Sequence, residues 1–253
     1  MKKILQIIIF FSITISSACD CVISNFTEKY SHADFVAEIK ITKTYPNQGN
    51  KELYKSDIQI LNLFKGDSLN SIYVVGRSDE NMGSSCDIYI PEETQLLAYA
   101  YKNEDGKYLI EMCSGLTYTK NHYYINDEKV IKEKEMLSVL KKENKKLINR
   151  IRFDNNGYLN EQLNQFRGVE LNKEFSLFEI KFSSDLKVKQ VKVISGFEKD
   201  LDKKLVDILK SIEWRSFNNG VKNKIPENTK MLFEIHYYPG EKGNSSFLSR
   251  NFL

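Results

Sequence analysis

The stretch LYKSDIQILNLFKGD, residues 53–67, indicates the fold most directly. Leu53 to Phe64 carries β-branched and aromatic side chains that favour a β-strand, and Lys65-Gly66-Asp67 is a turn signal that closes it. Similar runs recur between turn signals on both sides of it. With this stretch they make five predicted strands, and five short strands predict a small all-β barrel. The other four runs are Ala33 to Thr44, Ser71 to Arg77, Thr94 to Tyr101 and Lys107 to Met112.

Beyond the barrel the hydrophobic pattern changes to a helical one. Lys and Glu crowd between Asp127 and Arg152, around apolar residues at spacings of three, four and seven. This spacing predicts an amphipathic helix, so residues 121–152 are expected to form a helical connector. The apolar residues are Met136, Leu137, Leu140, Leu147 and Ile151.

The last hundred or so residues predict a second domain, 153–253. Glu174 to Phe182 and Leu186 to Ser195 are expected to form a hairpin around Ser183-Ser184-Asp185. Leu201 to Ile212 follows helical spacing, and Met231 to Tyr238 is a closing strand. The order ββαβ is about the minimum for an independent α+β domain.

The N-terminus has the features of a secretory signal. Met1-Lys2-Lys3 is a charged start, Ile4 to Ile15 is apolar, and Ser16-Ser17-Ala18 supplies small residues for cleavage. An uncleaved anchor is the alternative, but the apolar run is shorter than the roughly 20 residues that a spanning helix needs. We therefore expect residues 1–18 to be removed, Cys19 to be the first residue, and the protein to be periplasmic, outer-membrane-associated or extracellular.

Charge and composition exclude several classes of protein. The 253 residues are 41% hydrophobic and 12% aromatic, which is enough for a proper core, so disorder is not expected. Without Lys2 and Lys3, 35 of the 37 basic residues remain against 34 acidic ones, so the net charge is +1. This balance lacks the excess of basic residues by which proteins bind nucleic acid. The charge divides into −5 over residues 19–120 and +6 over residues 121–253.

All four cysteines lie in the first half: Cys19, Cys21, Cys86 and Cys113. In an oxidising compartment thiols tend to pair, which favours two disulfides. A zinc site is an alternative, although C-x-C is tighter than the usual C-x-x-C. A lipoprotein is another: Cys19 would carry lipid and attach the protein to a membrane, but Ser16 stands where such signals usually have Leu, Ile or Val.

Residues 19–120 resemble the N-terminal domain of the tissue inhibitors of metalloproteinases, a netrin-type module with an OB-fold. The resemblance rests on the cysteine frame together with several strand motifs. These motifs are Ala33-Asp34-Phe35-Val36, Tyr54 through Ile60, Phe64-Lys65-Gly66, Ser84-Ser85-Cys86, Leu96-Leu97-Ala98-Tyr99 and Cys113-Ser114. The third disulfide of that domain and the family's disulfide-rich C-terminal domain are missing.

The resemblance implies a disulfide pairing and a binding edge. In that family the first cysteine pairs with the third and the second with the fourth, which implies Cys19–Cys86 and Cys21–Cys113. The amine and carbonyl of the first cysteine chelate the zinc of a target protease, and the residue that follows enters its specificity pocket. The implied inhibitory edge is therefore Cys19, Asp20, Cys21, Ser84 and Ser85. With the charged Asp20 in that place, the target's pocket should be basic or polar.

Residues of about 170 to 240 resemble the C-terminal domain of TonB-type energy transducers. The likeness rests on Phe178 to Phe182, Lys187 to Gly196, Leu201-Asp202, Trp214 and the strand Phe233 to Tyr237, and it departs at Ser216, where that family usually has Pro. The membrane helix and Pro-rich spacer of a transducer are absent from this sequence. The resemblance therefore implies a Gram-negative envelope or secreted protein rather than a transducer.

No constellation of catalytic residues stands out. His32, His122 and His236 are scattered, and HExxH, GxSxG, P-loop and GxGxxG motifs are absent from the sequence. We therefore expect a binding protein that is not an enzyme and has no cofactor of its own. Two functions stay open: a metalloprotease-inhibitor-like module, and a non-inhibitory structural or adaptor component of the envelope. In either case the partner is a protein.

Overall fold

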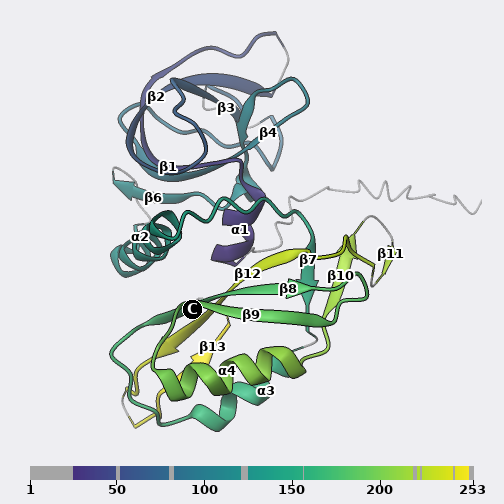
Figure 1. Ribbon diagram of the computed structural model, residues 1–253. Helices are drawn as coiled ribbons and strands as arrows, with labels where there is room; N and C mark the ends of the chain where they lie inside the picture. Colours follow the sequence, from purple (N-terminus) through teal and green to yellow (C-terminus); the bar gives the residue numbers. More distant parts are fainter. Residues whose placement is uncertain are drawn as a thin grey trace, which may run out of the picture.

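The computed structural model describes residues 25–49, 52–79, 83–120, 125–155, 157–218, 221–222, 224–241 and 243–250. Figure 1 shows a barrel at one end of the molecule and a sheet covered by helices at the other. Other helices lie in the layer between them. The predicted combination of a barrel and a small α+β unit is confirmed at this level.

The barrel is closed by five strands. β1 (Phe35–Thr44), β2 (Leu53–Lys65), β3 (Ser71–Val75), β5 (Tyr108–Ile110) and β4 (Gln95–Lys102) follow one another in space, and β1 pairs with β4 to complete the ring. All pairs are antiparallel except β3 with β5. The five predicted strands are these five. β6 (Thr117–Lys120), which pairs with β4, was not predicted.

The turn after β2 shows why its sequence ends the strand there. Gly66 has φ +86°, and a Cβ at this position would lie 2.5 Å from the Asp34 carbonyl oxygen. Only glycine fits such a close approach of two backbones. The interior of the barrel is filled by aliphatic and aromatic side chains, chiefly Phe35, Ala37, Ile39, Ile41, Tyr54, Ile72, Val74, Ile90, Leu96, Ala98 and Ile110.

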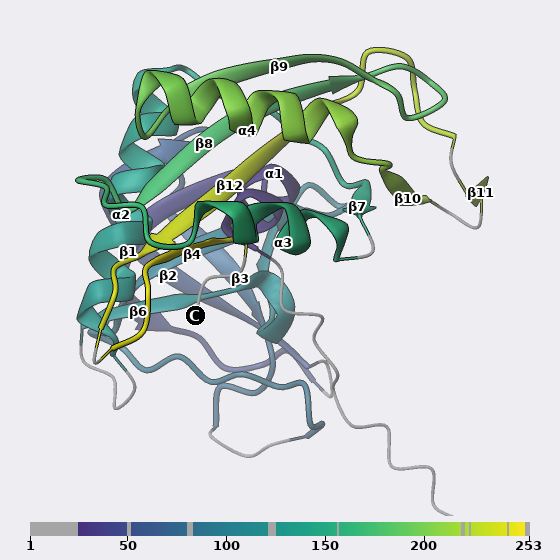
Figure 2. The same cartoon turned by 90° about the horizontal axis from the view of Figure 1, so that it is seen from below.

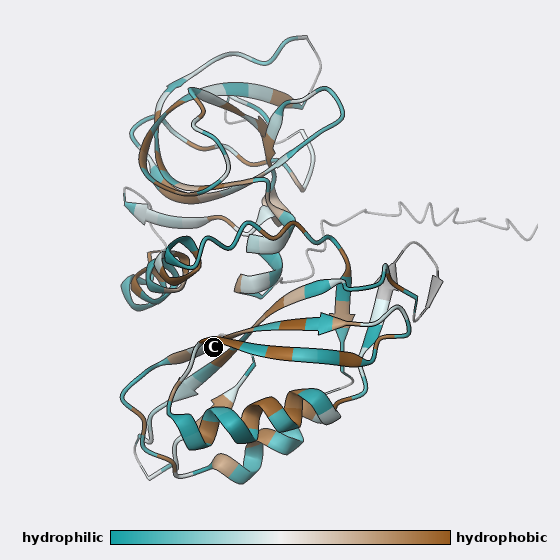
Figure 3. Cartoon of the chain, viewed as in Figure 1, coloured by the Kyte–Doolittle hydropathy of each residue, from teal (hydrophilic) through white to brown (hydrophobic). Residues whose placement is uncertain are grey.

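The C-terminal sheet has the order β13-β12-β8-β9. β8 (Phe175–Phe182) and β9 (Val188–Ser195) form the predicted hairpin, and β12 (Lys230–Tyr238) is the predicted closing strand. β13 (Phe247–Ser249) adds a short fourth strand that the sequence did not indicate. The predicted helix is α4 (Lys199–Ser211), which carries both hydrophobic and hydrophilic residues in Figure 3.

Side chains of β8 and β12 alternate between two cores. Phe178 and Phe233 face α4 and Trp214, whose ring meets the rings of Phe182 and Phe233 edge to face at 5.8 and 5.5 Å. Figures 1 and 2 show α4 and α3 (Tyr158–Leu163) on this side, away from the barrel. A small sheet of β11 (Val221–Lys222), β10 (Arg215–Asn218) and β7 (Arg152–Asp154) lies beside it.

The opposite face of the C-terminal sheet shares a core with the barrel. Leu177 and Leu232 from that sheet pack with Val36 and Leu97 from the barrel, and α1 (Phe26–His32) and α2 (Asp127–Lys142) complete the layer. α1 was not predicted. The two parts of the chain are therefore joined by a continuous apolar layer as well as by the connecting segment.

The connector helix is shorter than predicted, because α2 ends at Lys142. Asn144 has φ +48°, and the N–H groups of Asn144 and Lys145 donate to the carbonyls of Lys141 and Leu140 at 3.0 and 2.9 Å. This pair of bonds is a Schellman motif, which satisfies the last carbonyls of a helix and ends it. Leu147 packs on the shared core from an extended segment, so helical spacing alone misassigned it.

Candidate functional site

The predicted edge and disulfide residues that the structure describes lie in two segments of the barrel. Ser84, Ser85 and Cys86 lie between β3 and β4, and Cys113 lies in a 3-10 helix, η1 (Met112–Ser114), after β5. Cys19, Asp20 and Cys21 lie outside the described residues. Neither Cys86 nor Cys113 is a free thiol, because both are disulfide-bonded. The pairing with Cys19 and Cys21 stays a prediction.

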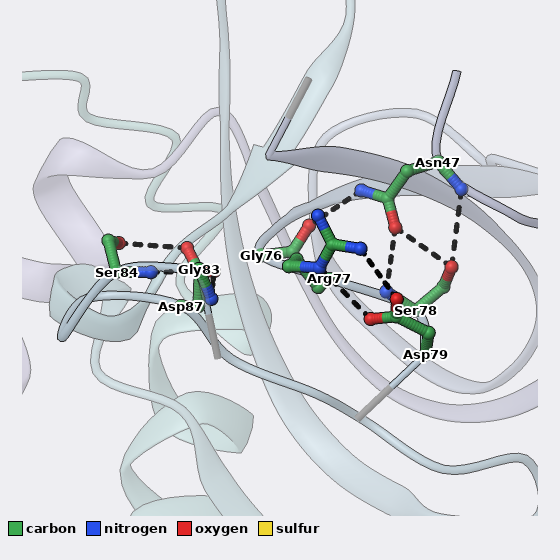
Figure 4. Close-up of polar contacts among 8 residues, drawn as sticks. All are labelled: Asn47, Gly76, Arg77, Ser78, Asp79, Gly83, Ser84 and Asp87. Carbon is green, nitrogen blue, oxygen red and sulfur yellow. Dashed lines mark hydrogen bonds and ion pairs between the residues drawn. The ribbon is translucent and has the colours of Figure 1, made fainter. Parts of the chain in front are cut away.

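The segment that holds Ser84 is folded around one carboxylate. Asp87, which is 9% exposed, accepts from the backbone N–H groups of Gly83 and Ser84 at 2.8 and 3.1 Å. The Ser84 hydroxyl donates to the other Asp87 oxygen at 2.9 Å and accepts from the N–H of Cys86 at 3.3 Å. Figure 4 shows Ser84, Gly83 and Asp87 together. Charge-assisted bonds of this kind fix a short turn.

A second pair of segments is held together by Asn47, which follows β1. Its amide donates to the Gly76 carbonyl at 2.8 Å and accepts from the N–H and the hydroxyl of Ser78 at 2.8 and 2.9 Å. Beside it, Arg77 forms a two-bond ion pair with Asp79, at 3.0 and 2.5 Å. Both groups are drawn in Figure 4. Asn47 therefore ties the β1–β2 turn to the chain that leaves β3.

The turn around Asp87 and the contacts of Asn47 meet at Gly76. This glycine has φ +149°, and a Cβ there would lie 2.2 Å from the Ile88 carbonyl oxygen. The N–H of Ile88 donates to the Val75 carbonyl at 3.2 Å, so residues 83–90 run against the end of β3. From inside the barrel, Tyr54 accepts from the Ile90 N–H at 2.9 Å. We call residues 45–49, 76–79 and 83–90 the barrel-end loops.

The two predicted serines have different surroundings. Ser84 is half-buried and its hydroxyl serves the turn, whereas Ser85 is exposed. Met112, next to Cys113, is 46% exposed. Ser85 and Met112 are therefore exposed, whereas the Ser84 side chain holds the turn.

The sequence does not point to Asn47, Gly76, Ser78 or Asp87 as site residues. Only Asp87 left a local signal, because a carboxylate three residues after Ser84 has the spacing of a side chain that bonds to nearby backbone. The hydrogen bond from Asn47 to Gly76 joins residues 29 positions apart, and a local sequence pattern cannot predict a contact at that separation.

The histidines lie in separate places. His236 is fully buried in the C-terminal sheet, and burial lowers its pKa to about 3. His32 lines a cavity of about 170 Å³ with Lys29, Glu111 and Arg152, and burial together with the nearby Arg152, Arg150 and Lys65 lowers its pKa. His122 lies outside the described residues. Among the described residues, His, Cys, Asp and Glu side chains do not gather in threes that could hold a metal ion.

No protein-family model matches the chain, and no curated protein matches it at a significant level. The likenesses to metalloproteinase inhibitors and to TonB C-terminal domains therefore stay predictions. In the part of the chain that the structure describes, no helix is both long and apolar enough to cross a membrane.

Proposed function

We propose that the protein is an exported binding protein that recognises a target with the barrel-end loops and the N-terminal segment beside Cys86, and that this target is a metalloprotease. The observation that carries the proposal is the turn around Asp87. Its side chain holds the backbone of Gly83 and Ser84 while Ser85 stays exposed. Loops that are ordered before binding lose less entropy on association, which favours tight recognition.

The chemistry of the N-terminus supports this target class. A free α-amine has a pKa of about 7.7 to 8, so a fraction of it is neutral near pH 7. With the carbonyl of Cys19 it can fill the open coordination position that a catalytic zinc keeps for water. Asp20 would then enter the specificity pocket, and a buried carboxylate needs a partner. The proposed target therefore has a basic or polar pocket beside its zinc.

The test compares the mature protein with a form that has one extra N-terminal residue and with Asp20→Thr, against a panel of metalloproteases. The extended form should lose inhibition by about a hundredfold, or ~2.7 kcal/mol, because its first amine no longer belongs to Cys19. Asp20→Thr should shift inhibition toward proteases with apolar pockets. Equal inhibition by the mature and extended forms would show that the amine does not bind the zinc.

The barrel-end loops are tested with Asp87→Asn. An asparagine keeps only one acceptor oxygen and has no charge, so either the two backbone N–H groups or the Ser84 hydroxyl loses its acceptor. The turn should therefore loosen, and inhibition should weaken about tenfold, or ~1.4 kcal/mol. Asp105→Asn is the matched control, since Asp105 is exposed in the turn between β4 and β5. An unchanged inhibition constant for Asp87→Asn would remove the barrel-end loops from the binding site.

A second function is supported by the core that the barrel shares with the C-terminal sheet. A shared core keeps two surfaces at a fixed separation, as an envelope adaptor requires. Intact-mass measurement of the exported protein distinguishes the two, because diacylglyceryl on Cys19 would block its amine and attach the protein to a membrane. Failure of all three forms to inhibit any protease would also favour the adaptor.

A further inference from the structure

The start of α1 is held by the far end of the chain. In the part of the chain that the structure describes, the Asn25 side chain makes no capping hydrogen bond to α1. Instead, the N–H of Thr27 donates to Oε2 of Glu234 at 2.9 Å, across 207 positions of sequence. The first N–H groups of a helix lack partners within the helix and need an acceptor. Glu234, on β12, supplies one.

A second residue near the C-terminus binds the same end of α1. Arg250 lies 4.0 Å from Glu28 and over the ring of Phe233, at 5.3 Å. When the Asn25 amide is turned so that its oxygen faces the guanidinium, it accepts from Arg250 at 3.1 and 3.3 Å. Glu234 and Arg250 together fasten the start of α1 to the C-terminal sheet.

Glu234 is isolated from water, and its hydrogen bonds and charged neighbours only partly replace the lost hydration. It is 1% exposed, and among the described residues Oε1 finds no hydrogen-bond partner. The charged and titratable groups around it are Arg250 beyond β13, Glu28 and Lys29 on α1, and Tyr99 on β4. Lys29 is already engaged by Glu133 on α2, so it does not neutralise Glu234.

This environment favours the protonated acid. Burial raises the pKa of Glu234 from 4.5 to about 7, against the opposing effects of the Thr27 N–H and Arg250. Because the folded protein holds the proton more tightly than the unfolded chain, the gain in stability is complete below about pH 4.5 and is lost as the pH rises through about 7. The buried anion is the costly state.

We propose that Glu234 is a proton-operated clasp between the C-terminal sheet and α1: the neutral acid keeps the interface closed, and the anion loosens it. α1 begins five positions after Cys21. The clasp therefore fixes the position of α1, the first element that the structure describes after Cys21. Its effect on target recognition rests on the proposed function, whereas the clasp itself does not.

Hydrogen exchange of the full protein at about pH 6 and about pH 8, corrected for intrinsic exchange rates, tests the clasp. Protection of a peptide that covers 25–33 should fall about tenfold over this range, as expected for a group that titrates near 7. Glu234→Gln keeps an acceptor for the Thr27 N–H and loses the charge, so its protection should not change with pH. Glu179→Gln, on the neighbouring β8, is the control and should behave as the wild type. A pH-independent wild type, or a variant as pH-dependent as the wild type, overturns the clasp.

A second measurement needs no variant. Carbon NMR of the Glu234 carboxyl in the wild type should show titration near 7, and titration near 4.5 would overturn the proposal. Inhibition assays at the same two pH values distinguish failure of the clasp from failure of the proposed function. A protein that inhibits no protease removes the proposed function but leaves the exchange result standing.

Discussion

The interior of the barrel and the layer that joins the barrel to the C-terminal sheet are built differently. Aliphatic and aromatic side chains fill the barrel, from Phe35 to Ile110. The joining layer is apolar at its centre but also contains ionisable side chains that water scarcely reaches, those of Lys29, Glu133 and Glu234. Burial of apolar surface tolerates small changes of shape, whereas a buried charge depends on each of its partners. The joining layer should therefore be the more sensitive region to single changes and to pH.

Among these side chains, Glu133 on α2 has partners on several elements, and it is 2% exposed. Its carboxylate forms an ion pair with Lys29 and accepts hydrogen bonds from the hydroxyls of Tyr99 and Thr117, the latter at 2.8 Å. Burial lowers the pKa of Lys29, and Glu133 opposes that shift. Burial also raises the pKa of Tyr99 well above its usual value. One carboxylate thus links α1, α2, β4 and β6.

The largest effect is expected from Glu133→Leu. The change leaves Lys29 buried without its partner, and breaking a buried pair in this way should lower the free energy of unfolding by about 3–5 kcal/mol. Urea unfolding near neutral pH measures this. The double variant Lys29→Met with Glu133→Leu should regain much of the loss, because it removes both charges. A single variant as stable as the wild type would mean that the joining layer is no more sensitive than the barrel.

Tyr54→Phe tests hydrogen bonds between the barrel interior and the barrel-end loops. Tyr54 is 1% exposed, and its hydroxyl accepts from the Ile90 N–H and donates to the Ile88 carbonyl at 3.4 Å. Its loss leaves buried backbone groups without a partner, so we expect a destabilisation of about 1–3 kcal/mol in urea unfolding. Tyr158→Phe, at a half-exposed ring, is the control and should stay within about 0.5 kcal/mol.

Ile39→Val probes the apolar interior alone. Ile39 is fully buried on β1, and the loss of one methylene there should cost about 0.5–1.5 kcal/mol, with no dependence on pH. Unfolding at about pH 6 and about pH 8 should give the same difference from the wild type. A difference that changes with pH would show that titrating groups in the joining layer influence the barrel interior.

Strand runs were the most predictable part of the fold. Leu53 to Phe64 matches β2 almost residue for residue, because a long run between turn signals is a local property. α1 was missed, since its seven residues lack a capping side chain and contacts with Glu234 and the shared core hold it in place. The end of α2 was missed because Asn144 in a left-handed conformation stops the helix, whereas the apolar spacing continues to Ile151.

The candidate site was less predictable than the fold. Ser84, Ser85 and Cys86 came from a family resemblance, and their local order comes from Asp87 and from the close approach of Gly76 to Ile88. Asn47 reaches its partners across the barrel end, so its role depends on the closed ring of strands. Contacts between distant segments leave no periodic trace in the sequence, whereas hydrophobic alternation does.

The smallest effect is expected one residue after Glu133. Lys134 pairs with Glu38 of the barrel at 2.6 Å, but its side chain is 36% exposed and that of Glu38 is 14% exposed. Water and salt screen such a pair and its side chains lose entropy, so Lys134→Gln should cost at most about 1 kcal/mol. The cost should shrink further in about 1 M salt, whereas that of Glu133→Leu should change little because its pair is shielded from solvent. The two substitutions affect neighbouring residues of α2, which both form ion pairs with other parts of the chain. Unequal costs would therefore show that burial, rather than the presence of an ion pair, makes the joining layer sensitive, and equal costs would contradict that account.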